Sequence, residues 1–167
     1  MREESGVRSE QNRRSAADTP HPSPLASLAK AGTVLAFDFG AKRIGVAVGE
    51  SRLRIAHPVA TIPASDRRTR FAAIEQLIAE WRPDLLVVGL PAHMDGNEHE
   101  MSRRCRNFAR SLEGRFRIPV HLVDERLSSR AAQSALAEAG AAHRRRKAAL
   151  DPVAAQLILQ SFFDEAA

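Results

Sequence analysis

The sequence has few of the cysteine and aromatic residues on which disulfide-bonded and base-stacking proteins depend. Of its 167 residues, one is a cysteine, one is a tryptophan and none is a tyrosine. The single cysteine, Cys105, excludes an internal disulfide, and we therefore expect a reduced, cytoplasmic protein. Aromatic residues make up 5% of the chain, so a platform on which single-stranded bases stack is not expected.

Long apolar runs are also missing. None approaches the roughly 18 residues that cross a bilayer, so the sequence predicts no membrane-spanning helix. Residues 1–31 are polar, include acids and lack the apolar core of a secretory signal. They show no periodicity, which predicts a disordered N-terminal tail. Residues 32–167 are then expected to form one domain, long enough to bury a substantial core.

Positive charge is in excess and is unevenly distributed. The formal net charge is +5 and the sequence pI is about 10.5, which favours a polyanionic partner. The run His143–Lys147 is basic throughout. A looser basic series consists of Arg103, Arg104, Arg106, Arg110, Arg115 and Arg117. Either group could hold nucleic-acid phosphates or could simply be a solvated face.

The first apolar runs are typical of β-strands. Residues 33–38, 43–50 and 54–63 predict three strands joined by short turns, and the two prolines of the third place it at an edge. Ser65 is the expected N-cap of a helix that Pro83 ends. The wholly apolar run of residues 84–91 predicts a strand covered on both faces.

The second half of the chain alternates helices and strands. A basic helix is expected from about Glu98 to Glu113, ended by Gly114, and a fifth strand in residues 118–126. An alanine-rich helix should begin at Ser128 and a last one at Asp151, as N-cap. The order predicts an α/β fold with a mixed five-stranded sheet. Its first three strands are antiparallel, the rest are parallel, and helices cover both faces.

Acidic residues stand at the ends of these elements. Asp38 ends the first strand, Asp124 and Glu125 end the fifth, and Asp151 begins the last helix. Carboxylates held together repel by about 1 to 4 kcal/mol per pair at 4 Å. A divalent cation removes that repulsion, and oxygen ligands without a Cys–His cluster favour Mg²⁺ or Mn²⁺. Two such ions can activate water and stabilise the leaving oxygen of a phosphodiester.

Each acid also has a purely structural interpretation. Asp38 could hydrogen-bond the turn amides that follow it, Asp151 could only cap its helix, and Glu125 could pair with a nearby arginine. Strand alternation sends Asp124 and Glu125 to opposite faces, so one of the two should join the site. Glu125 is the favoured ligand, and Asp124 stays an alternative.

Three other patterns do not lead to a function. The tripeptide Asp38–Gly40 matches a kinase motif, but the rest of the kinase signature is missing. His93 and His99 have no further zinc ligand at the required spacing. Arginines beside Cys105 should lower its pKa, yet no catalytic partner is apparent, so an inert thiol is expected.

Four motifs resemble, in order, those of the YqgF family, also called RuvX. They are AFDFGAKRIGVAVGE, VVGLPAHMDGNE, VHLVDERLSS and DPVAAQLILQSFF, and the resemblance covers about residues 33–165. These are Holliday-junction-resolvase-like proteins regarded as pre-16S rRNA nucleases. The resemblance implies an RNase H-like fold and a cytoplasmic bacterial nuclease. It also implies metal-dependent hydrolysis of phosphodiester bonds at the 5′ end of pre-16S rRNA during ribosome biogenesis.

The same resemblance assigns residues. By motif match, Asp38, Glu125 and Asp151 are the catalytic acids and the ligands of Mg²⁺ or Mn²⁺. The strand expected beside the first carries no acid, so Glu125 must reach inward. Independently of the resemblance, proximity in the chain to these acids predicts nucleic-acid contacts from Lys42, Arg43, Arg126, Arg144, Arg145, Arg146 and Lys147. Precursor rRNA is the expected partner of a monomer or homodimer. Resolution of branched DNA and nucleic-acid binding without cleavage are the alternatives.

Overall fold

The computed structural model describes residues 32–63, 65–91, 100–125 and 147–166. The elements are β1 (Thr33–Phe39), β2 (Arg43–Glu50), β3 (Ile55–Pro63), α2 (Arg67–Trp81), β4 (Leu85–Leu90), α3 (Glu100–Phe116), β5 (Val120–Asp124) and α5 (Lys147–Glu165). The predicted N-terminal tail and the predicted alanine-rich helix lie outside the described residues.

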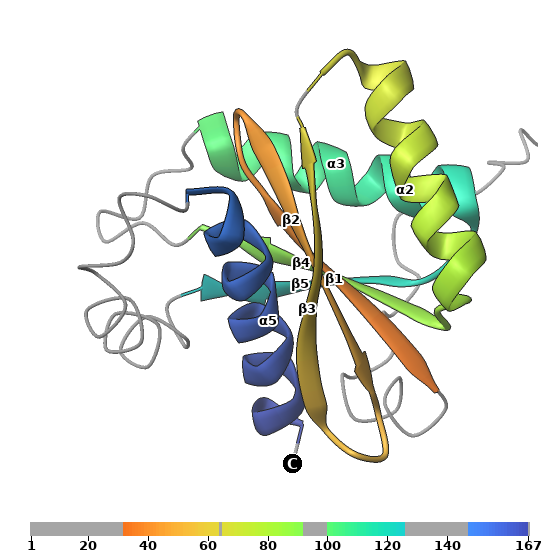
Figure 1. Ribbon diagram of the computed structural model, residues 1–167, viewed down its shortest axis with the longest axis vertical. Coiled ribbons are helices and arrows are strands. Elements are labelled where there is room, and N and C mark those ends of the chain that lie inside the picture. Colours follow the sequence, from red (N-terminus) through yellow and green to blue (C-terminus); the bar gives the residue numbers. More distant parts are fainter. Residues whose placement is uncertain (1–31, 64, 92–99, 126–146, 167) are drawn as a thin grey trace, which may run out of the picture.

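The strands form one five-stranded sheet in the order β3-β2-β1-β4-β5 (Figure 1). β1 pairs antiparallel with β2, and β2 pairs antiparallel with β3. β4 runs parallel to both of its neighbours, β1 and β5. The mixed sheet predicted from the sequence is therefore confirmed, with β3 at an edge as its prolines indicated.

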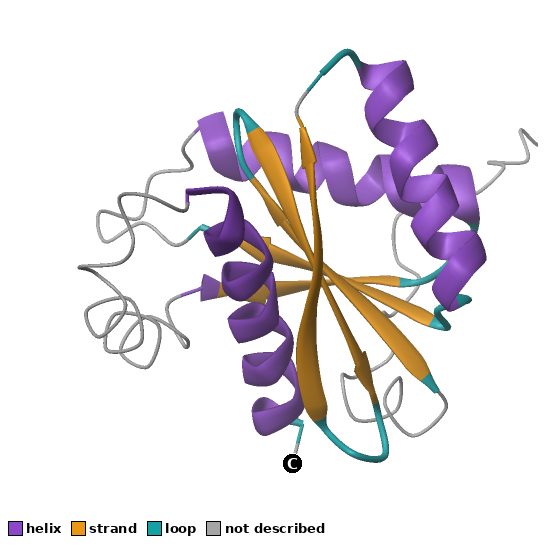
Figure 2. Ribbon diagram, viewed as in Figure 1, coloured by secondary structure: helices purple, strands orange, loops and turns teal. Residues whose placement is uncertain are grey.

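Helices cover both faces of the sheet, with α5 on one side and α2 and α3 on the other (Figure 2). Alternation along β2 sends Ile44, Val46 and Val48 into the core beneath α2 and α3, and Ala47 into the core beneath α5. Gly49 also faces α5, where a Cβ would lie 2.6 Å from Cε2 of Phe163. The glycine lets α5 approach the sheet closely.

Two helix boundaries differ from the sequence prediction. The N-cap of α2 is Asp66 rather than Ser65, because the Asp66 carboxylate accepts from the Thr69 N–H at 2.9 Å and from its hydroxyl at 2.8 Å. The α3 helix continues past Gly114 to Phe116. It ends where Arg117 takes a left-handed conformation, with a φ of 56°.

The start of α5 was also predicted wrongly. The helix begins at Lys147, so Asp151 is not its N-cap, and Pro152 lies inside it. The alanines and the leucine of residues 148–150 are strong helix formers and extend the helix backward. Pro152 lies past the first turn of the helix, so its ring removes the hydrogen bond that an N–H there would donate to the Ala148 carbonyl. Within the described part of the chain, no helix is long and apolar enough to span a membrane.

Candidate active site at the carboxyl ends of the parallel strands

Asp38 lies one residue before the end of β1 and is half-buried. Its neighbours Val34 and Ala36, at even spacing along the strand, belong to the core under α5, so Asp38 faces the same side. In the sheet it pairs with Gly45 of β2. Glycine at that position adds no side chain of its own beside the carboxylate.

Glu125 follows β5 and turns back over β4. Its Oε1 lies 2.8 Å from where a Cβ of Gly89 would stand. The pairing of Phe37 with Val88 puts Gly89 next to Asp38 in the sheet, one residue further along both strands. The Glu125 carboxylate therefore lies over the strand beside Asp38, and neighbouring strands are about 4.8 Å apart. Glu125 thus extends over β4, a strand that carries no acid of its own.

The two acids at the end of β5 have different surroundings. Val123 belongs to the core under α5, so Glu125, two residues later, continues on that face and Asp124 on the opposite one. Burial raises the pKa of the Glu125 carboxyl, and the nearby charge of Asp124 raises it further. Glu125 is thus the acid that shares a face with Asp38.

Cys105 of α3 lies in the core on the opposite face of the sheet, yet the charges of both carboxylates act on it. Burial raises the pKa of its thiol to about 12, and the charges of Glu125 and Asp38 contribute to the increase. The expectation that neighbouring arginines lower this pKa was wrong, because the thiol is buried while Arg104 and Arg106 are exposed. A thiol with so high a pKa is inert at neutral pH, as predicted.

The hairpin between β1 and β2 holds two of the predicted phosphate-binding residues. The Gly40 N–H donates to the Arg43 carbonyl at 2.9 Å, and a Cβ at Gly40 would lie 2.7 Å from that oxygen. The turn therefore requires glycine, and it presents Lys42 to solvent at the same end of the sheet as Asp38. Arg43 is half-buried at the first position of β2.

Several of the other predicted site residues lie beyond the described part of the chain, namely Arg126, Arg144, Arg145 and Arg146. Asp151 lies in α5, two turns before Ile158, and that helix begins at the side of the sheet where β4 and β5 end (Figure 1). The side chains of Lys147 and Asp151 are not among those described. Among the described residues, no three His, Cys, Asp or Glu side chains form a group that could hold a metal ion.

Gly89 is a residue of the site that the sequence interpretation missed. A Cβ there would lie 2.4 Å from Cδ1 of Ile158 as well as 2.8 Å from Glu125. The signal was present, since a glycine inside an apolar strand indicates a close approach by another group. Because Gly89 has no side chain, the Glu125 carboxylate can occupy the space above it.

The family model RuvX, described as a Holliday junction resolvase, matches residues 32–165. The chain belongs to the RuvX family. A relative from Methylobacillus flagellatus, named "Putative pre-16S rRNA nuclease", is 58% identical over 143 residues, which are 86% of this chain and 97% of that protein. A relative of the same name from Nitrosomonas europaea is 57% identical over 141 residues, 84% of this chain and 95% of that protein.

This chain also shares its fold with a solved resolvase. The structure titled "T. thermophilus RuvC in complex with Holliday junction substrate" superimposes with a TM-score of 0.50 and 15% identity. The matched region covers 80% of this chain and 95% of the RuvC chain. The likeness establishes the RNase H-like fold that the sequence predicted.

Proposed function

We propose that this RuvX protein is a metal-dependent nuclease that processes the 5′ end of pre-16S rRNA in the cytoplasm. Membership of the family makes it a hydrolase of nucleic-acid phosphodiester bonds. We place the active site at this end of the sheet because the Glu125 carboxylate extends over Gly89 toward Asp38. The names of the two relatives support precursor rRNA as the substrate.

The described donors fit a magnesium or manganese ion. Asp38 and Glu125 offer hard carboxylate oxygens at one end of the sheet, and burial together with Asp124 makes an unneutralised charge on Glu125 unfavourable. Asp38, Glu125 and, from α5, Asp151 would hold the ion. When bound, it would polarise the scissile phosphate and ease deprotonation of the attacking water.

The residues around the acids would position the strand. Lys42, on the exposed hairpin, and Arg43 would hold phosphates beside the cut bond. Arg126 and the run Arg144–Lys147 are assigned the same task from the sequence alone. Reversing the charges of Arg144–Lys147 should weaken RNA binding and flatten its salt dependence, and unchanged binding would count against that assignment.

The decisive experiment is cleavage of precursor rRNA with Mg²⁺, with Ca²⁺ or with a chelator. We expect Asp38→Asn, Glu125→Gln and Asp151→Asn each to lower the rate at least about 100-fold, because each removes a ligand that stabilises transition-state charge. Asp124→Asn is the matched control, since it removes a carboxylate from the opposite face and should cost only a few-fold. Equal losses in Asp124→Asn and Glu125→Gln would refute the assignment of Glu125.

A four-way DNA junction, compared with precursor rRNA at equal salt, tests the second candidate, which the description of the family model favours. Resolving a junction asks for two sites on a symmetric dimer, whereas trimming an RNA end needs one. Sedimentation of the protein with each substrate would therefore accompany the cleavage assay. Faster cutting of the junction by a dimer would replace rRNA processing with junction resolution. If the protein bound the junction and the precursor rRNA but cut neither, it would be a nucleic-acid-binding protein without nuclease activity.

A further inference from the structure

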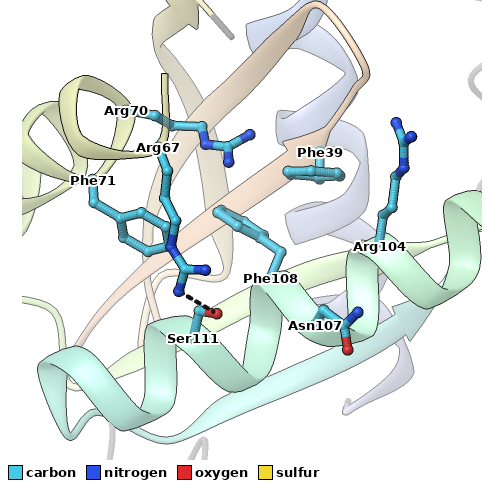
Figure 3. A pocket seen from close by; sticks show the side chains of 8 residues that line it. All are labelled: Phe39, Arg67, Arg70, Phe71, Arg104, Asn107, Phe108 and Ser111. Carbon is cyan, nitrogen blue, oxygen red and sulfur yellow. Dashed lines mark hydrogen bonds between the residues drawn. The ribbon is translucent and has the colours of Figure 1, made fainter. Parts of the chain in front are cut away.

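A hollow of about 300 Å³ opens between α2 and α3, on the face of the sheet opposite α5 (Figure 3). Arg67 and Arg70 line it from α2, Arg104 lines it from α3, and Phe39 forms part of it from the end of β1. None of the side chains that line it is acidic. The hollow is therefore a concentration of positive charge with an aromatic floor.

Aromatic rings hold the arginines in place. The Arg70 guanidinium lies 5.6 Å from the centroid of the Phe39 ring, and that of Arg67 lies 5.4 Å from the centroid of Phe71. Arg67 also donates to the Ser111 hydroxyl at 3.4 Å, the bond drawn in Figure 3. Cation–π contacts of this kind orient a guanidinium without neutralising it. The two arginines keep their charge available to a ligand.

The hydrogen-bonding capacity of the arginines is not used up within the described structure. The Nε of Arg70 is buried, and no hydrogen-bond partner for it exists among the described residues. Arg104 pairs with Glu100 at 2.7 Å, but both side chains are exposed, and such surface pairs add little stability. Buried donors are normally satisfied, so the Arg70 guanidinium keeps hydrogen-bonding capacity that the described residues do not use.

The hollow adjoins the candidate active site. Phe39 directly follows Asp38 in β1, so the two side chains leave the same end of the strand on opposite faces of the sheet. We propose that the hollow binds a backbone phosphate of the substrate strand close to the bond that is cut. This inference rests on the proposed function in taking the bound strand to be the substrate.

The chemistry favours a phosphate over a protein partner. Guanidinium groups recognise phosphate oxygens through paired hydrogen bonds, and arginines from two helices line this hollow. Its volume is at the lower end of the range of about 300–1,000 Å³ that small-molecule sites occupy. It therefore has room for one nucleotide unit rather than for a peptide segment or a helix.

Binding of a short, fluorescent single-stranded RNA tests the proposal. All measurements use the full chain carrying Asp38→Asn, so that cleavage does not interfere. We expect Arg67→Gln with Arg104→Gln to weaken binding about tenfold or more, since each change removes charge-assisted hydrogen bonds. The slope of log K against log salt should become shallower by about 0.7 for each phosphate that the variant no longer neutralises.

Arg68→Gln with Arg103→Gln is the matched control. It removes one charge from each of the same two helices, but neither residue lines the hollow and both are exposed. We expect it to weaken binding less than about threefold, as a general loss of positive charge would. Thermal unfolding of both double variants checks that they fold, and Arg67→Gln alone is the fallback because that residue is exposed.

Equal weakening in the two double variants would overturn the proposal and leave only a diffuse basic surface. A hollow that binds an acidic peptide but not RNA would also overturn it, in favour of a protein partner. Cleavage is measured separately with Asp38 intact. The protein with Asp38 intact could cut no precursor rRNA while the hollow variants still bound RNA more weakly than the control variants. That result would refute the proposed function, and the phosphate site would remain.

Discussion

The carboxylate of Glu125 occupies the space that a side chain at Gly89 would fill, with Oε1 2.8 Å from the position of a Cβ. This relationship joins two strands that meet only in the folded sheet. It explains how an acid beyond β5 reaches toward Asp38 across β4, which contributes no acid of its own. The pairing of a glycine with a glutamate therefore determines the shape of the candidate site.

Gly89→Ala should impair both folding and catalysis. The new methyl group would collide with Ile158 and displace the Glu125 carboxylate, at a cost to the free energy of unfolding of about 1–3 kcal/mol. A shift of the carboxylate by about 1 Å should slow cleavage about 100-fold. Chemical denaturation and the cleavage rate measure the two effects, and a variant with normal activity would show that Glu125 does not depend on this space.

Gly89→Ala combined with Ile158→Val separates the two effects. The valine lacks the Cδ1 atom that would stand 2.4 Å from the new Cβ, so stability should recover in part. The contact with Glu125 persists, so activity should stay low. Ile158→Val alone is the control and should cost about 0.5–1.5 kcal/mol of stability. Recovery of activity along with stability would mean that packing, rather than Glu125, limits the rate.

Glu125→Gln should stabilise the metal-free protein at neutral pH. The folded state raises the pKa of this carboxyl above the ordinary value of 4.5, so the folded protein binds the proton more tightly than the unfolded one does. Stability is then greatest below 4.5 and falls as pH rises through the raised pKa. The gain in Tm from the substitution, measured in chelator, should be present at pH 7 and vanish below pH 4.5. A gain independent of pH would point to packing instead.

Mg²⁺ should stabilise the wild-type protein more than the variants. Binding to the folded state alone raises the free energy of unfolding by about 2.7 kcal/mol at a concentration 100 times Kd. Differential scanning calorimetry over a Mg²⁺ titration should show a rising Tm that is absent from Asp38→Asn and Glu125→Gln. Asp164→Asn, which changes an exposed acid near the end of α5, is the control and should respond as wild type does.

Cys105 should react very slowly with thiol reagents in the native state. With a pKa near 12 it carries about 1000-fold less thiolate at pH 8 than an ordinary cysteine. Reaction with a disulfide reagent should accelerate when guanidinium unfolds the chain. Burial is the larger cause of the shift, so Glu125→Gln should change the native rate only slightly. Rapid native labelling would show that α3 opens readily.

Much of the architecture follows from local pattern. Alternation along residues 43–50 puts Ile44, Val46 and Val48 on one face of the sheet, and the wholly apolar run of β4 indicated a strand covered on both sides. Boundaries were harder. Ser65 and Asp66 are both good caps, and only the position of Thr69 selects between them. Asp151 followed by Pro152 is also a typical helix start, but the alanines before it extend α5.

For the candidate site too, some features could be predicted from the sequence and others depended on the folded structure. Strand alternation indicated that Asp124 and Glu125 face opposite sides of the sheet, because period-two geometry is a property of the chain itself, and the family motif favoured Glu125 as the partner of Asp38. The role of Gly89, the raised pKa of Glu125 and the arginine-lined hollow beside Phe39 depend on distances between segments far apart in the sequence. Burial and close approach are set by packing across the sheet, so tertiary structure alone decided them.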